Sequence, residues 1–129
     1  MNKYLERLGQ RPLVLDGAMG TAIYDKGVFV NACYDELSLT NPGLIDGIHR
    51  AYVEAGADML LTNTFGANHM KLRSFGLGER VAEINRAGVM LARAAIGEAG
   101  LVAGDVGPCT EFARGLTEAA AGEVEAAFK

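Results

Sequence analysis

The stretch LVLDGAMGT, residues 13–21, decides the fold of this chain. Its first three residues, Leu13 to Leu15, form a continuous apolar run, which is typical of a strand buried on both faces of a parallel sheet. The run ends at Asp16 and a turn that contains two glycines. Folds of the α/β class place their ligands at the carboxyl ends of such strands. We therefore expect a ligand site directly after Leu15.

The glycine turn offers two kinds of ligand contact. Gly17 and Gly20 let a ligand approach the backbone closely, and the N–H groups between them are free to bind an anion such as a carboxylate. Asp16 stands beside them as a partner for a cation. The same residues also fit an ordinary turn in which Asp16 caps the next helix. The motif alone leaves both interpretations open.

Two further apolar runs repeat this plan. The second run, at 59–61, precedes a stretch that comprises Thr62, Asn63, Thr64 and Phe65. The third run, at 101–104, precedes Asp105. The polar side chains at these strand ends either bind a ligand or cap the next segment of the chain.

Helical periodicity fills the intervals between the apolar runs. One helix begins at Asn41 as N-cap with Pro42 at the first helical position and ends at Gly56, and a second covers 79–97. Such helices suit right-handed parallel crossovers. We predict an α/β fold, a parallel βαβαβ segment that forms about three units of a (β/α)8 TIM barrel. Shorter helices are expected at 1–10, 21–26 and 117–129, with irregular chain at 28–40.

The length of the chain indicates a part of a domain. A barrel of eight such units needs more than about 250 residues, whereas this chain has 129. The last helix also ends without the usual stop signal. We therefore expect residues 1–129 to be the amino-terminal portion of a larger barrel domain, cut within the helix after the third strand.

The composition excludes several classes of protein. Half of the residues are hydrophobic and the net charge is −4, with Lys and Arg scattered, which argues against a nucleic-acid or anionic-membrane partner. No apolar stretch approaches the roughly 18 residues that span a bilayer. The charged first eight residues lack the apolar segment of a signal peptide. We therefore expect a cytoplasmic protein.

The cysteines and histidines give no metal-binding pattern. Cys33 and Cys109 lie far apart in the sequence, which favours free thiols over a disulfide in a reducing compartment. Adding His49 and His69 produces no recognisable ligand spacing. We predict no metal site in these residues.

Four motifs taken together resemble one enzyme family. They are LVLDGAMGT (13–21), NPGLIDGIHRAYVEAGADMLLTNTFGAN (41–68), EINRAGVMLARAA (83–95) and LVAGDVGP (101–108). In this order and at these separations they resemble the amino-terminal part of the homocysteine S-methyltransferase family, over residues 11 to 128. That family includes the homocysteine-binding module of cobalamin-dependent methionine synthase, betaine–homocysteine methyltransferase and a bacterial fusion with methylenetetrahydrofolate reductase.

The resemblance implies a zinc-dependent enzyme that transfers a methyl group to the homocysteine thiolate and gives methionine. A bound cation holds the thiol as the thiolate, which is the nucleophile. By the resemblance, Asp16 binds the substrate ammonium group, and the substrate carboxylate lies on the backbone of Gly17, Ala18, Met19 and Gly20. Thr62, Asn63, Thr64 and Phe65 line the same pocket, and Asp105 is a weaker candidate. The methyl donor is a methylfolate acting through cobalamin, S-methylmethionine or a betaine.

The chain departs from the family in two places. The zinc-binding cysteines of the family lie beyond the middle of the barrel and in a Gly-Cys-Cys-Gly stretch near its end, and Cys33 and Cys109 match neither position. Some relatives also carry an acid where this chain has Leu61, so one contact to the substrate amine is missing or supplied elsewhere. We therefore expect the isolated chain to be inactive.

Two other functions fit the same residues. The glycine turn serves equally well for another small anionic substrate in a different TIM-barrel enzyme. Alternatively, the chain is a non-catalytic partial barrel that associates with itself or with the missing barrel half, because an open parallel sheet exposes strand edges and apolar faces.

Overall fold

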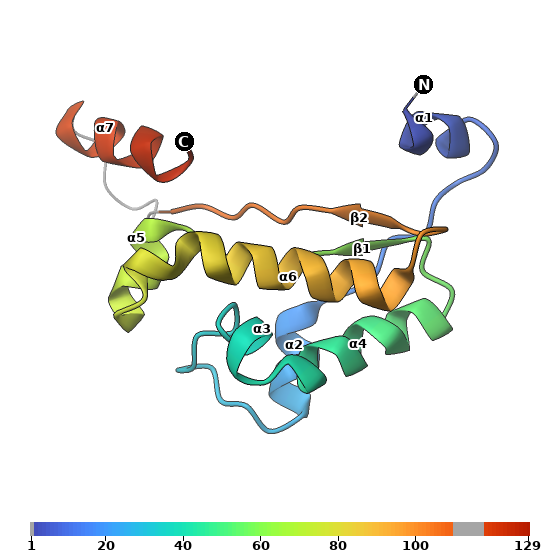
Figure 1. Cartoon of the computed structure of the whole chain (residues 1–129), viewed down its shortest axis with the longest axis horizontal. Helices are drawn as coiled ribbons and strands as arrows, with labels where there is room; N and C mark the ends of the chain where they lie inside the picture. Colours follow the sequence, from blue (N-terminus) through green and yellow to red (C-terminus); the bar gives the residue numbers. More distant parts are fainter. Residues whose placement is uncertain (1, 110–117) are drawn as a thin grey trace.

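The computed structural model describes residues 2–109 and 118–129. Helices precede, separate and follow two strands along the chain (Figure 1). In chain order the elements are α1 (Lys3–Leu8), α2 (Met19–Asp25), α3 (Leu37–Thr40), α4 (Pro42–Glu54), β1 (Met59–Leu61), α5 (His69–Leu72), the 3₁₀ turns η1 (Arg73–Phe75) and η2 (Gly78–Arg80), α6 (Val81–Ile96), β2 (Leu101–Ala103) and α7 (Glu118–Ala127).

The sheet is parallel, as predicted, but it holds two strands in the described chain and not three. β1 pairs with β2 in the register Met59 to Leu101. The first apolar run joins β1 through a single parallel bridge between Leu15 and Met59. The ladder stops there because the next donor, the Leu61 N–H, binds the side chain of Asp16 at 3.1 Å and no backbone carbonyl. The predicted strand at 13–15 is thus a bridge at one edge of the sheet, with β1 in the centre.

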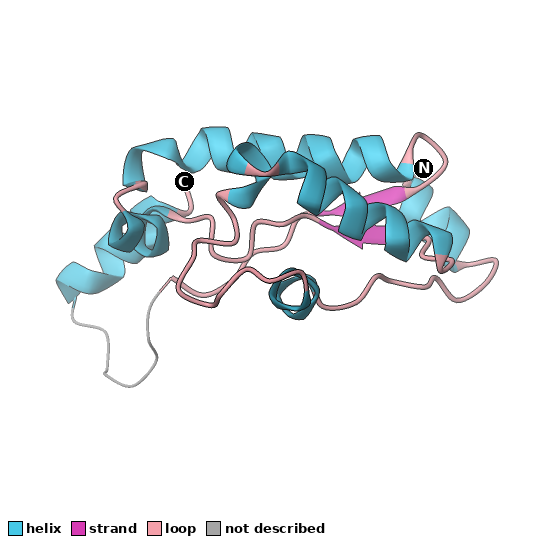
Figure 2. Cartoon of the chain, turned by 90° about the horizontal axis from the view of Figure 1, so that it is seen from below, coloured by secondary structure: helices cyan, strands magenta, loops and turns pink. Residues whose placement is uncertain are grey.

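The two long helices lie together on one side of the strands (Figures 1 and 2). α4 starts at Pro42 and the chain turns after it at Gly56, whose φ of 103° favours glycine. Asn41 occupies the predicted N-cap position, but its side chain makes no capping hydrogen bond. α6 ends at Gly97, with φ of 69°. Both predicted crossover helices are confirmed.

Burial of apolar side chains holds this layer together. The fully buried side chains include Leu60 on β1, Ile45 on α4, Ile84 on α6 and Ile23 on α2. Each such side chain contributes about 1.5–3 kcal/mol to folding by leaving water. Buried apolar side chains form two clusters, one of Ile23, Ile45 and Ile48 on α2 and α4, and one of Cys33, Ala67, Leu72 and Ile84 beside α5 and α6.

Two short helices, α3 and α5, were not predicted from the sequence. α3 lies within the stretch 28–40 and packs between α4 and α6. α5 begins at Asn68, whose side chain accepts a hydrogen bond from the Lys71 N–H at 3.0 Å. The three shorter helices predicted at 1–10, 21–26 and 117–129 are present as α1, α2 and α7.

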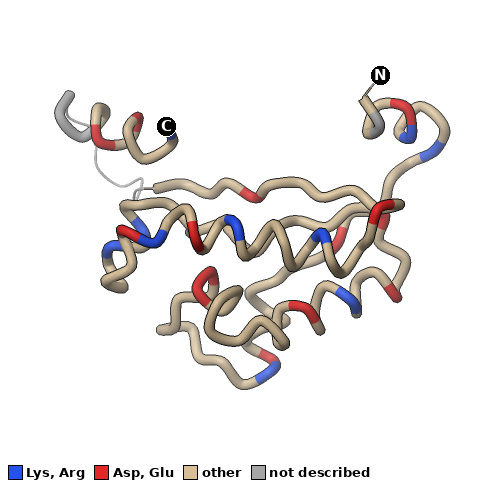
Figure 3. The backbone as a smooth tube through the Cα atoms, in the orientation of Figure 1, with Lys and Arg blue, Asp and Glu red and all other residues tan. Residues whose placement is uncertain are grey.

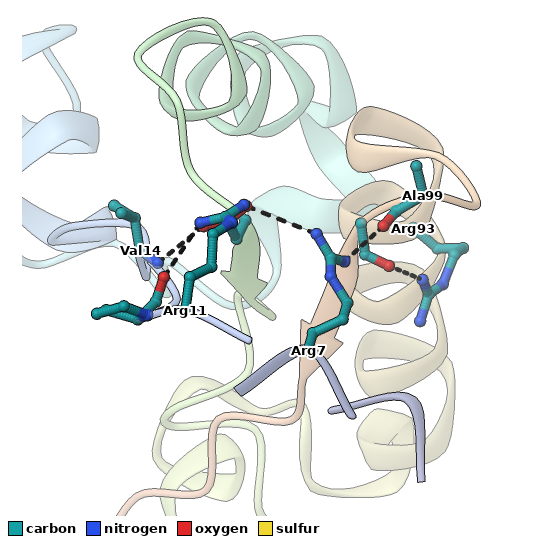
Figure 4. Close-up of polar contacts among 8 residues, drawn as sticks. Arg7, Arg11, Val14, Arg93 and Ala99 are labelled. Carbon is teal, nitrogen blue, oxygen red and sulfur yellow. Dashed lines mark hydrogen bonds and ion pairs between the residues drawn. The ribbon is translucent and has the colours of Figure 1, made fainter. Parts of the chain in front are cut away.

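Charged side chains tie the amino ends of the strands together (Figure 4). The guanidinium of Arg11 donates to both carboxylate oxygens of Asp58, which directly precedes β1, and Arg7 lies 3.6 Å from the same carboxylate. The Val14 N–H also donates to Asp58, at 3.0 Å. The Arg11 hydrogen bond above all holds the pKa of Asp58 at about 2. Arg7 further donates to the Ala99 carbonyl before β2, so this cluster joins all three sheet segments at one end.

Elsewhere the charges are dispersed along the backbone (Figure 3). The sequence carries 12 Lys and Arg against 16 Asp and Glu, and the tube shows the two signs interspersed over the helices. Among the helices that the structure describes, none has both the length and the apolar character needed to cross a membrane.

Candidate functional site

Polar residues gather at the carboxyl ends of the strands, opposite the arginine cluster. Thr62, Asn63 and Thr64 follow β1 and are buried, whereas Phe65 is 56% exposed. Asp105 follows β2. The side chains that the sequence placed after the second and third strands therefore do come together in space.

Hydrogen bonds between Thr62, Thr64 and Asp105 join the two strand ends. The hydroxyls of Thr62 and Thr64 lie 2.6 Å apart. Thr64 donates to the Asp105 carbonyl at 2.8 Å, and the Asp105 N–H donates to the Thr62 hydroxyl at 2.9 Å. These two hydroxyls are thus engaged by the protein, and their direct effect is to fix the position of Asp105.

Asn63 connects the end of β1 to the loop that precedes α3. Its amide donates to the Tyr34 carbonyl at 2.8 Å and to the Ser38 hydroxyl at 3.2 Å. Both Asn63 and Ser38 are buried. The side chain therefore anchors the loop at 28–36 over the strand ends.

The two carboxylate oxygens of Asp16 lie in different surroundings. Oδ2 accepts the Leu61 N–H. Oδ1 is buried and has no hydrogen-bond partner among the described residues. Burial, followed by the negative charge of Asp105, raises the pKa of Asp16. A buried carboxylate oxygen without a donor is costly for the folded state, and a cation with N–H donors would offset that cost.

The glycine turn is shaped by Tyr52 of α4. The Tyr52 hydroxyl donates to the Ala18 carbonyl at 2.9 Å. A Cβ on Gly17 would stand 2.8 Å from the same hydroxyl oxygen, so a side chain at this position would push Tyr52 away. Glycine at position 17 is needed for this close approach.

A cavity of about 510 Å³ opens beside these groups. It is lined by Met19 and Gly20 of the turn, residues 62–66 after β1, Asp105, the loop residues 30 and 32–35, and Lys71 and Phe75. Asp16, Gly17 and Ala18 lie outside this lining. Seven of the ten residues named from the sequence therefore share one cavity, and the remaining three lie along the chain next to them.

Asp35 is the cavity residue that sequence reasoning missed. Its Oδ1 accepts the Gly66 N–H at 2.9 Å. Burial raises the pKa of Asp35, and backbone hydrogen bonds partly oppose that rise. Its position in a loop longer than a plain connection was the available signal. The pKa of Asp105 is also raised by burial. Three carboxyls whose charged forms are disfavoured thus lie near one another.

The described residues do not fit a zinc ion. They contain no group of three or more His, Cys, Asp or Glu side chains placed to hold a metal. Both cysteines are free, and burial raises the pKa of the Cys33 thiol, which disfavours the thiolate that zinc requires. No step of a reaction is therefore assigned to a metal on these residues.

Comparison with known proteins identifies the family. The model of the homocysteine S-methyltransferase family matches residues 13–129. The chain belongs to this family. It is 36% identical over 120 residues to a methionine synthase of Mycobacterium tuberculosis, covering 84% of the chain, and 38% identical over 95 residues to that of Mycobacterium leprae, covering 69%. This family member spans only 10% and 8% of those two proteins.

Solved structures agree with the family and the barrel architecture. The homocysteine methyltransferase MmuM of Escherichia coli matches 83% of the chain with a TM-score of 0.71 and 31% identity in its oxidized form. The metallated form of MmuM matches with the same TM-score and 30% identity. The family member described here covers 41% and 42% of those chains. Its fold is therefore that of a part of the MmuM barrel.

Proposed function

We propose that this chain forms the amino-acid-binding part of a homocysteine S-methyltransferase. In this proposal the ammonium group of homocysteine pairs with Asp16, and the carboxylate accepts hydrogen bonds from the backbone of residues 17–20. Thr62, Asn63, Thr64 and Phe65 shape the pocket wall. The observation that carries the proposal is the buried Oδ1 of Asp16, which lacks a donor among the described residues.

The backbone of the glycine turn supports the anion half of the proposal. Among the described residues, no acceptor is bound by the N–H groups of Gly17, Ala18 and Met19. Backbone N–H groups that lack a protein acceptor are the donors that carboxylates use in such turns. In this proposal the Asp16 carboxylate, which binds the ammonium group, is next in the chain to backbone N–H groups that bind the carboxylate. An α-amino acid requires both kinds of group.

We further propose that methyl transfer needs residues other than those described here. The side chains of the described residues bind and orient the amino acid in this proposal. Among them, no group of metal ligands is placed to hold the substrate sulfur as a thiolate. The methyl donor is a methylfolate acting through cobalamin, S-methylmethionine or a betaine. The isolated chain is accordingly expected to retain no zinc after a zinc titration with homocysteine and desalting, and to transfer no methyl group.

The test is a homocysteine titration of the full chain by equilibrium dialysis under reducing conditions. Asp16→Asn removes the negative charge, and we expect binding to weaken by about tenfold to a hundredfold, because a hydrogen-bonded charge contributes about 1.5–3 kcal/mol. Asp25→Asn, on the exposed last residue of α2, is the matched control and should bind as the unaltered chain does.

The same titration separates the alternatives. Binding of homocysteine that Asp16→Asn leaves unchanged would contradict the assigned role of Asp16. If homocysteine does not bind but inorganic phosphate does, the chain belongs to a barrel enzyme for a different anionic substrate.

A further inference from the structure

We propose that Asp35 is a positioning residue for the substrate pocket, which it shapes by holding the backbone at Gly66 in place. The inference rests on the proposed function, because it names a residue that acts on the same pocket without touching the amino acid. The four family motifs at 13–21, 41–68, 83–95 and 101–108 do not include Asp35.

The contact between Asp35 and Gly66 is close and specific. The Gly66 N–H donates to Asp35 Oδ1 at 2.9 Å. A Cβ built on Gly66 would stand 2.7 Å from Asp35 Oδ2, so the carboxylate occupies the space in which a side chain at position 66 would start. At Gly66 the turn is therefore held against the loop by this hydrogen bond and by the absence of a side chain, in addition to the Asn63 hydrogen bond to the Tyr34 carbonyl.

The residue before Asp35 makes further polar contacts of the same loop. The Tyr34 carbonyl accepts the Asn63 amide, and the Tyr34 hydroxyl donates to the Val28 carbonyl at 2.9 Å. The Tyr34 ring lies 3.8 Å from the position of a Cβ on Gly20. Two consecutive residues thus connect the glycine turn, the strand end and the loop.

Apolar contacts hold other points of the loop, because Val28 and Tyr34 pack against the cluster of Ile23, Ile45 and Ile48, and Cys33 packs with Ala67, Leu72 and Ile84. Phe29 and Val30 are 73% and 78% exposed, so the hydrophobic effect does not fix them. The carboxylate of Asp35 is itself costly to bury. Its hydrogen bond to Gly66 is therefore the contact whose loss should free the backbone at Gly66, while Thr64 keeps its hydrogen bonds to Thr62 and to the Asp105 carbonyl.

The experiment compares Asp35→Ala with Asp35→Asn, with Asp25→Asn as the exposed control. Asparagine retains an oxygen that accepts the Gly66 N–H, whereas alanine retains none. We expect homocysteine to bind about tenfold more weakly to Asp35→Ala and within about threefold of normal to Asp35→Asn. Equal losses in the two variants would mean that Asp35 acts through its charge, and would overturn the proposal.

A second measurement does not depend on homocysteine. Amide hydrogen exchange, followed by mass spectrometry at low concentration, should show that the peptide containing Gly66 loses protection in Asp35→Ala and keeps it in Asp35→Asn. If homocysteine fails to bind the unaltered chain, the proposed function fails, and exchange at Gly66 alone then decides the positioning role. Unchanged protection in Asp35→Ala would overturn that role.

Gly66→Ala approaches the same contact from the other partner. In the unaltered chain the new methyl group meets the Asp35 carboxylate, so we expect about tenfold weaker homocysteine binding. In the Asp35→Ala background the space is free, and the substitution should add little. Additive losses in the double variant would show that the two residues act independently, against the proposal.

Discussion

The carboxylate of Asp16 takes the place of a backbone carbonyl. In a continuing parallel ladder the Leu61 N–H would bind the carbonyl of residue 16, but it binds Oδ2 of the side chain. This exchange ends the bridge at Leu15 and frees the chain to enter the glycine turn. One side chain thereby terminates the pairing, and its other oxygen is buried without a hydrogen-bond partner among the described residues.

His49 is a second residue whose surroundings determine its behaviour. It lies on α4 with no exposed surface, and neither ring nitrogen has a hydrogen-bond partner among the described residues. Burial lowers the pKa of His49, against the opposing charge of Asp46. The folded protein therefore holds a neutral imidazole in an apolar environment.

We predict that His49 makes folding stability fall on acidification. The unfolded chain has the ordinary pKa of 6.5 and the folded chain a lower one, so the unfolded state binds a proton first. The free energy of unfolding should decline as the pH falls through 6.5 towards the folded pKa. The raised pKa values of Asp16, Asp35 and Asp105 act in the opposite sense. They make the free energy of unfolding rise as the pH falls through the range in which carboxyls titrate.

Urea unfolding at about pH 7.5 and about pH 5.5 checks this prediction. His49→Leu and His49→Gln should each remove most of the loss between the two values, whereas His69→Gln, on an exposed histidine, should leave it. An equal loss in all four proteins would show that another group is responsible.

At the scale of the elements, α6 approaches the end of β1 so closely that it requires a glycine. Gly88 is buried in α6. A Cβ on it would stand 2.7 Å from Cγ2 of Thr64 and 3.3 Å from the Asn63 carbonyl. The helix therefore presses directly on the strand end that forms the pocket wall.

Gly88→Ala should destabilise the protein by about 1–3 kcal/mol through overpacking, even though alanine favours a helix. Gly47→Ala is the matched control, because Gly47 is an exposed glycine of α4 with nothing within 4 Å of its Cβ position. That variant should gain up to about 1 kcal/mol. Urea unfolding measures both, and a stabilised Gly88→Ala would contradict the close approach.

The sequence predicted the elements whose signals are local. Apolar runs indicated β1 and β2, and apolar periodicity with terminal glycines indicated α4 and α6. α3 and α5 have four residues each, too few for a periodic pattern, and they depend on packing and on one Asn68 cap. The first strand failed as a prediction because the Asp16 contact that shortens it is tertiary.

The candidate site was predictable to a similar extent. Strand ends indicated where 62–65 and Asp105 would meet, because parallel strands place their carboxyl ends together. Asp35 was not predictable, since its partner Gly66 lies 31 positions away and no spacing rule connects them.

The whole molecule leaves both edges of its small sheet without a partner strand in the described chain. β1 is central, with the bridge segment on one side and β2 on the other. Apolar side chains near those edges are exposed, Val14 by 54% and Val106 by 72%. Unpaired edges and exposed apolar residues promote association between chains.

We therefore predict that the isolated chain self-associates at micromolar concentration. Light scattering should give a mass that rises with concentration, and Val14→Lys, which places a charge at one edge, should reduce that rise. The exposed substitution Asp25→Asn should not. A concentration-independent monomer that unfolds cooperatively would contradict the prediction.

The ion-pair cluster around Asp58 and the pocket occupy opposite ends of the same strands. Variation confined to residues that follow the strands leaves Arg7, Arg11 and their shared carboxylate untouched. Libraries that vary only exposed positions after β1 and β2, such as Phe65 and Val106, and keep the buried residues 62–64 should consequently retain the fold, so that selection can act on ligand preference.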